Sequence, residues 1–191
     1  NSNKLINAST EDRTSSSSQK VASGQYGNFQ VVWLKNIDRL MDLLPINIQP
    51  SRYSFLDVGC GSGISTLYFM QFYDFKNYHG FDFREELISS ANENLKRYKK
   101  LHECPKVPIF YVQDAIDVKL NPSTPYFIYM YNPFDYSVAR AFLLQNITLL
   151  KRQKCILAVS NDVWVTSLLE DFSGMRTIRN AAHNLSLYFF E

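Results

Sequence analysis

Short apolar segments alternate with helical segments along most of the chain, and this alternation restricts the fold more than any other feature. Five of the apolar segments have the length and composition of buried β-strands. Strands that alternate with helices form a parallel sheet covered by helices on both faces. The five predicted strands are residues 53–58, 78–83, 107–112, 126–131 and 155–159.

The intervening segments carry apolar side chains at helical spacing. One helix is predicted from residue 25 to a point before Pro45, and its Trp33 is expected in the core. Two further helices are predicted at 64–73 and 163–172. The remaining two are recognised by their apolar faces, which are Leu87, Ala91, Leu95 and Tyr98 in one and Ala139, Leu143, Ile147 and Leu150 in the other.

The end of the chain, residues 175–190, is predicted to form two strands joined near 180–184. These would add a hairpin at one edge of the sheet. The predicted fold class is therefore α/β, a three-layer α-β-α sandwich with a seven-stranded, mostly parallel sheet and a C-terminal antiparallel hairpin.

The chain has 191 residues, which is typical of one domain with a sizeable core. Residues 1–24 contain few large apolar groups and include the run TSSSS, so we expect a flexible or lid-like N-terminal segment. Residues 25–191 are predicted to form a single domain.

A glycine cluster follows the first predicted strand. Three of the seven glycines of the chain, Gly59, Gly61 and Gly63, stand at alternate positions there. In an open parallel sheet, ligands bind beyond the carboxyl ends of the strands. Glycine permits positive φ and lets a ligand contact the main chain. A turn alone would need only one glycine, so the cluster predicts a ligand site.

The spacing of this cluster indicates which ligand it suits. A dinucleotide loop has the pattern G-x-G-x-x-G, but Ile64 stands where its last glycine would fall. This disfavours a nicotinamide-dependent oxidoreductase, and no GK[ST] phosphate loop is present. Asp57 stands two residues before the first glycine, and a carboxylate suits an ammonium group better than a pyrophosphate. The pattern therefore favours a nucleoside that carries an amino acid.

The stretch from Asp57 to Gly63, DVGCGSG, resembles the first motif of the class I (Rossmann-like) S-adenosylmethionine-dependent methyltransferases, acidic-hydrophobic-G-x-G-x-G. The resemblance extends from about residue 54 to the end of the chain, because the seven-strand order with a terminal hairpin is also that of the family. It implies methyl transfer with S-adenosyl-L-methionine as the cofactor. In this motif the implied cofactor-binding residues are Asp57, Gly59, Cys60, Gly61 and Gly63.

Asp82 ends the second predicted strand. The resemblance implies that its carboxylate accepts hydrogen bonds from both ribose hydroxyls, with Phe83 beside it in the cofactor site. A structural role is an alternative, because Asp82 and Glu85 match a capping box that would open the following helix. The family often has a capping residue where this chain has Arg84.

Asp114 closes the third predicted strand. The resemblance implies that its carboxylate accepts from the adenine amino group and that the N–H of Ala115 faces the ring. The alternatives are that Asp114 only shapes a turn, or that nearby Asp117 takes the ligand role.

The fourth predicted strand runs into the sequence YNPFDY. It partly resembles the N-P-P-aromatic motif of methyltransferases that modify amino groups. Tyr131, Asn132 and Phe134 are therefore predicted as catalytic residues that form walls of the reaction pocket, with Asn132 also near the cofactor. We do not expect this segment to bind a nucleobase amine. The favoured alternative is a turn without that role, in which Pro133 sets φ and Asp135 caps the next helix.

Composition restricts the partners and the compartment. The net charge of +2 lacks the concentrated basic face of nucleic-acid binders, so the expected acceptor is a small molecule or a protein side chain. Two basic clusters, 96–100 and 151–154, fall where helices should end.

Three cysteines without a C-x-x-C pair support neither a disulfide framework nor a metal site, and favour the cytoplasm. No apolar run is long enough to span a bilayer. The alternative function is a catalytically inactive methyltransferase-like module that serves as a binding or interaction surface.

Overall fold

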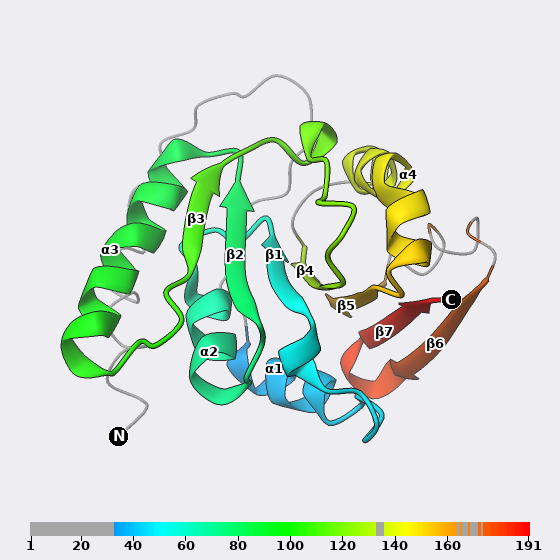
Figure 1. Ribbon diagram of the computed structural model, residues 1–191, viewed down its shortest axis with the longest axis horizontal. Helices are drawn as coiled ribbons and strands as arrows, with labels where there is room; N and C mark the ends of the chain where they lie inside the picture. The colour runs from blue at the N-terminus through cyan, green and yellow to red at the C-terminus, as the bar shows by residue number, and fades with distance from the viewer. Residues whose placement is uncertain (1–32, 133–135, 164, 166–167, 169–171, 173) are drawn as a thin grey trace.

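The computed structural model describes residues 33–132, 136–163, 165, 168, 172 and 174–191, and these contain a single seven-stranded sheet (Figure 1). The strand order is β3-β2-β1-β4-β5-β7-β6. The strands are β1 (Ser54–Val58), β2 (Asn77–Asp82), β3 (Ile109–Val112), β4 (Tyr126–Tyr131), β5 (Ile156–Ser160), β6 (Met175–Asn180) and β7 (Leu185–Phe190).

Strands β3, β2, β1, β4 and β5 are parallel, whereas β7 pairs antiparallel with β5 and β6 pairs antiparallel with β7. The C-terminal hairpin thus lies at one edge, and its second strand is inserted next to β5. Each strand lies within two residues of its predicted position. The predicted fold class is confirmed.

Helices cover both faces of the sheet. Helices α1, α2 and α3 pack on one face and α4 on the other. Val165 and Leu168, described residues of the helix predicted at 163–172, are helical and buried. The helix bounds are α1 (Leu34–Met41), α2 (Ile64–Phe72), α3 (Glu85–Leu101) and α4 (Tyr136–Arg152), with short 3₁₀ helices η3 (Pro50–Arg52), η4 (Ala115–Asp117) and η5 (Ala181–His183).

Charges at the ends of α3 agree with its dipole. Glu85 and Glu86 lie in the first turn, near the partial positive charge, and Lys99 and Lys100 lie in the last turn. The cluster at 151–154 likewise lies at the carboxyl end of α4. Both basic clusters are therefore explained by helix termini, as predicted.

An aromatic cluster fills the core beneath α1 and α2. Phe55 and Phe127 from neighbouring strands are fully buried, and the Phe69 ring of α2 lies 4.4 Å from that of Phe55 and 5.0 Å from that of Tyr129. Burial of one such side chain is worth about 1.5–3 kcal/mol. The cluster fixes α2 against the centre of the sheet, and α2 in turn fixes the loop that precedes it.

Trp33 was expected in the core, and this prediction was wrong, because its side chain is 72% exposed. Trp33 lies four residues before Ile37, but it is the N-cap of α1 with an extended backbone (φ −81°, ψ 100°), so its side chain does not follow the helical face that buries Ile37 and Leu40. Residues 25–32 of the predicted helix and the segment 1–24 lie outside the described residues. No helix in the described part of the chain is long and apolar enough to cross a membrane.

Candidate active site

The carboxyl ends of the central parallel strands meet at one edge of the sheet. In the register of the strands, Val58 at the end of β1 lies beside Phe81 of β2 and Met130 of β4. Tyr131 at the end of β4 lies beside Ser160 at the end of β5. The segments that follow β1, β2, β4 and β5 are therefore neighbours, as the prediction of a ligand site at this edge requires (Figure 1).

The glycine loop connects β1 to α2. Gly59, Gly61 and Gly63 have φ values of 72°, 54° and 75°, the left-handed region that costs an ordinary residue about 1–2 kcal/mol. The N–H groups of Gly59 and Cys60 both donate to the carbonyl of Phe81 at 2.9 Å. The loop is thus a sharp turn fastened to β2, and its glycines are required by the backbone itself.

Packing adds a second reason for Gly63 and requires a further glycine, Gly80 of β2. A Cβ on Gly63 would lie 2.8 Å from Cζ of Phe110, and a Cβ on Gly80 would lie 2.9 Å from Cβ of Cys60. The Cys60 side chain is buried between the loop and β2, so only its main chain could contact a ligand. Our sequence analysis did not identify Gly80, although a glycine within a predicted strand signals a close approach.

The Asp57 carboxylate lies beneath the loop and is buried. Its Oδ2 accepts hydrogen bonds from Oγ of Ser65 at 2.6 Å and from Oγ1 of Thr66 at 2.7 Å. Burial raises its pKa to about 6, although the two hydroxyls oppose this shift. Asp57 therefore ties the end of β1 to the first turn of α2. The contacts of Ser65 and Thr66 with Asp57 were not predicted from the sequence, and the binding of an ammonium by Asp57 stays a prediction.

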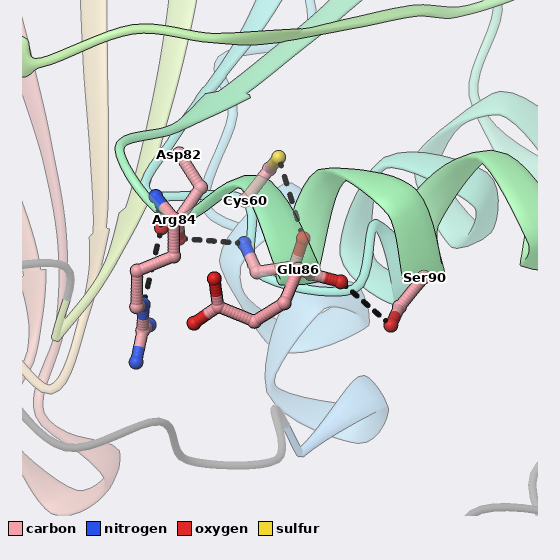
Figure 2. Close-up of polar contacts among 6 residues, drawn as sticks. Cys60, Asp82, Arg84, Glu86 and Ser90 are labelled. Atoms are coloured by element: carbon pink, nitrogen blue, oxygen red, sulfur yellow. Dashed lines mark hydrogen bonds and ion pairs between the residues drawn. The ribbon is translucent and has the colours of Figure 1, made fainter. Parts of the chain in front are cut away.

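Asp82 lies at the end of β2 and contacts both the glycine loop and Arg84, the residue before α3 (Figure 2). Its Oδ2 accepts from the N–H of Gly61 at 3.2 Å, while its Oδ1 accepts from the N–H of Arg84 at 3.0 Å. Nε of Arg84 forms an ion pair with the same Oδ1 at 3.3 Å. Since Asp82 is 4% exposed, these contacts hold its carboxylate in one orientation beside the bare main chain of the loop.

The capping-box alternative for Asp82 and Glu85 was wrong. The residue at the N-cap of α3 is Arg84, which makes no side-chain cap, and Glu85 is the first helical residue. A capping box needs the acid at the N-cap and its partner three residues later, and this helix begins too late for that. Phe83 is 38% exposed, and the guanidinium of Arg84 lies 5.4 Å from the centre of its ring.

Asp114 and Ala115 follow β3. The N–H of Gln113 donates to the carbonyl of Asp82 at 3.0 Å, so the two strand ends lie together. Asp114 caps η4, because its carboxylate accepts from the N–H of Ile116 at 3.1 Å. Ala115 is buried. The turn role of Asp114 is therefore observed, and the adenine role of both residues stays a prediction. Rival Asp117 lies in η4 and is exposed.

Asn132 directly follows β4 and has a left-handed φ of 41°. Its Oδ1 accepts a hydrogen bond of 2.9 Å from Nδ2 of Asn161, which sequence analysis did not identify as a site residue. Tyr131 is half-buried and packs against the aromatic cluster. Phe134 lies outside the described residues, together with Pro133 and Asp135.

The described residues fit an adenosyl ligand. Gly61 has no Cβ, so a ligand can approach its main chain, and its N–H donates a hydrogen bond to the Asp82 carboxylate. A nucleoside needs both features, since its sugar hydroxyls donate to a carboxylate and its substituent passes close to the backbone. The fold and this edge together define the architecture of the class I methyltransferases.

The comparisons with known proteins agree with this architecture. Residues 55–153, more than half of the chain, match the family model for the methyltransferase domain. The chain belongs to this family and is an S-adenosylmethionine-dependent methyltransferase with an unidentified acceptor. A search of curated protein sequences finds no match.

Solved structures share the fold at low sequence identity. A SAM-dependent methyltransferase from Aquifex aeolicus is 20% identical with a TM-score of 0.57, and the match covers 81% of this chain and 87% of that one. An rRNA methylase from Streptococcus thermophilus is 13% identical with a TM-score of 0.53, covering 82% and 93%. A ribosomal protein L11 methylase from Lactobacillus delbrueckii subsp. bulgaricus is 13% identical with a TM-score of 0.55, covering 81% and 78%. One fold thus accompanies both an RNA methylase and a protein methylase.

Proposed function

We propose that the edge formed by the glycine loop, Asp82, Asp114 and Asn132 binds S-adenosyl-L-methionine and directs its methyl group to a small molecule or a protein side chain. The observation that carries this proposal is the hydrogen bond between Gly61 and Asp82. This bond places a buried carboxylate next to the main chain of a glycine at the carboxyl edge of the sheet.

The cofactor, when bound, supplies a methyl group already activated on a sulfonium. The chain then has to bind and orient the reactants. Asp82 holds the ribose hydroxyls in this proposal. Among the described residues, its Oδ2 accepts only from Gly61 and keeps capacity for one hydroxyl, whereas its Oδ1 already accepts twice from Arg84, so the second hydroxyl takes the place of the Arg84 side chain. Asp114 and Ala115 face the adenine, and the main chain from Gly59 to Gly63 contacts the methionyl part.

Tyr131, Asn132 and Phe134 line the acceptor side in this proposal. Their task is to hold the acceptor nucleophile in line with the methyl group and to exclude water. Well-oriented reactant pairs gain about 7–11 kcal/mol from such positioning. A general base is required only for an acceptor that is protonated at neutral pH.

Charge favours a small molecule or a protein over a nucleic acid as the acceptor. The net charge of the chain is +2, and several cations near strand ends are paired within the chain. Arg84 pairs with Asp82, Lys106 with Asp74 and Arg179 with Asp162. Nucleic-acid affinity comes largely from cations that contact phosphates, and paired cations contribute less.

Calorimetry with S-adenosylmethionine and with its demethylated product tests the cofactor site. We expect binding of both; no heat at millimolar ligand would reject the proposal. Tritiated cofactor is then incubated with metabolite extract, unfolded protein and total RNA in separate reactions. Label in the metabolite or protein fraction supports the acceptor class, whereas label in RNA alone overturns it. Binding without any transfer would favour the alternative, an inactive binding module.

We also propose that residues 25–191 act as one methyltransferase domain, with residues 1–24 as a flexible or lid-like segment. Limited proteolysis with and without S-adenosylhomocysteine tests this, since a lid becomes protected on binding. The cytoplasm is the proposed compartment. In its support, Cys60, Cys104 and Cys155 are all free thiols, which a reducing environment preserves.

A further inference from the structure

Two asparagines occupy equivalent places at the carboxyl edge of the sheet. Asn132 is the first residue after β4, and Asn161 is the first residue after β5. The preceding residues, Tyr131 and Ser160, are paired in the sheet register. Both asparagines have left-handed backbones, with φ of 41° and 62°. Asparagine is enriched several-fold among the few ordinary residues with such φ, so the matched pair is a specific feature.

Their carboxamides contact each other directly. Nδ2 of Asn161 donates to Oδ1 of Asn132 at 2.9 Å, a well-formed hydrogen bond. A second polar contact joins the same two strands. The hydroxyl of Tyr129 in β4 donates to Oγ of Ser160, the last residue of β5, at 3.2 Å. The rest of β5 is apolar and buried, so the polar side chain of this strand lies at the edge that carries the proposed acceptor site.

The contacts of Asp162, the residue after Asn161, fix the position of the backbone at Asn161. The carboxylate of Asp162 is fully buried and accepts from Arg179 at 2.7 and 3.0 Å and from the hydroxyl of Ser186. The N–H of Asp162 also donates to the carbonyl of Asn184 at 3.0 Å. These contacts fasten the chain after β5 to the C-terminal hairpin, so Asn161 presents its amide from a rigid support.

We propose that Asn161 is a positioning residue for the methyl-transfer site. It holds the carboxamide of Asn132 in one orientation toward the place where the methyl group and the acceptor nucleophile meet. The proposal rests on the proposed function, because it takes Asn132 to line that place. Asn161 itself contacts Asn132 and acts only through it.

The test compares two cofactor analogues that differ only at the sulfur centre and the methyl position attached to it. Sinefungin has an amine-bearing carbon there, and S-adenosylhomocysteine has a bare sulfur. The ratio of their dissociation constants reports contacts at that position, since a general loss of stability affects both equally. Asn161→Gly keeps the left-handed backbone and removes the amide. Asn161→Asp keeps the size and removes the donor, and serves if the glycine variant does not fold. Lys154→Gly is the matched control, a left-handed residue (φ 49°) two residues before the start of β5.

We expect both Asn161 variants to shift the ratio by about fivefold, the factor that one neutral hydrogen bond is worth. Lys154→Gly should leave the ratio unchanged. In the ligand-free protein, the side-chain amide NMR signals of Asn132 should move in Asn161→Gly and stay in Lys154→Gly. A ratio that stays at the wild-type value, or unmoved Asn132 signals, overturns this inference alone. If the wild type binds neither analogue, the proposed function fails and the inference falls with it.

Discussion

The backbone N–H of Gly61 donates to the carboxylate of Asp82 at 3.2 Å, across a separation of 21 residues in the sequence. This contact joins the loop after β1 to the end of β2. The two halves of the proposed nucleoside site are therefore one hydrogen-bonded unit, and a change at either residue should affect the other.

Replacement of Asp82 by Asn should weaken the binding of S-adenosylmethionine by about tenfold or more, because hydrogen bonds to charged groups are worth about 1.5–3 kcal/mol. The melting temperature should also fall, because Nδ2 of Asn would face the N–H of Gly61 or Arg84 in place of an acceptor, so the affinity is measured at a temperature where the variant is folded. Calorimetry and thermal unfolding measure the two effects. Asp42→Asn, a change at an exposed carboxylate at the carboxyl end of α1, is the control and should alter neither. Unchanged affinity in Asp82→Asn would show that Asp82 only supports the loop.

Gly63→Ala should destabilise the protein more than Gly174→Ala does. Both glycines have left-handed backbones, with φ of 75° and 78°, so both variants lose about 1–2 kcal/mol from the backbone. Only at Gly63 would the new Cβ meet a neighbour, 2.8 Å from Phe110, whereas at Gly174 the nearest atom lies 4.0 Å away. Overpacking adds about 1–3 kcal/mol. Urea unfolding of the two variants measures the difference, and equal losses would contradict the crowding.

The pKa of Asp57 predicts how stability depends on pH. Burial raises this pKa from 3.8 to about 6, so between these values the folded protein retains a proton that the unfolded chain has released. The free energy of unfolding should therefore fall as the pH rises through this window, by up to about 1.4 kcal/mol per unit, and level off above it. Asp57→Asn should lack this contribution. Denaturant unfolding of both proteins at pH 4.5, 5.5 and 7.5 checks this, and parallel profiles would refute it.

Arg179→Met should lower the melting temperature more than Arg176→Met. Both arginines lie on β6, but Arg179 pairs with the fully buried Asp162, whereas Arg176 pairs with the exposed Glu191. Loss of Arg179 leaves a buried carboxylate without its cation, and loss of an exposed pair costs little. Burial opposes ionisation of Asp162, but Arg179 and Ser186 outweigh it and lower the pKa. The Arg179 effect should therefore shrink as the pH falls below 3.8, as thermal unfolding at pH 3 and pH 7 would reveal.

Local patterns were sufficient to predict the elements of this fold. The apolar runs that became β1, β4 and β5 are buried along most of their length, and such runs are visible in the sequence without any knowledge of their neighbours. The same holds for the glycine loop, since left-handed turns require glycine wherever they occur.

Contacts between distant residues could not be predicted in this way. The sequence left open whether Asp82 caps α3 or binds a ribose, and its contact with Gly61 was not predicted, because that depends on where the helix begins relative to the loop. The pairing of Asn132 with Asn161 depends on the register of β4 against β5, which no local pattern contains.

The sequence by itself thus determined the order of strands and helices and the place of the glycine loop, because periodicity and backbone preference act over a few residues. Tertiary structure alone decided the partners of Asp57, Asp82 and Asn161 and the exposure of Trp33. Strand register and helix packing bring together groups that lie far apart along the chain, and only that arrangement decides which polar groups meet.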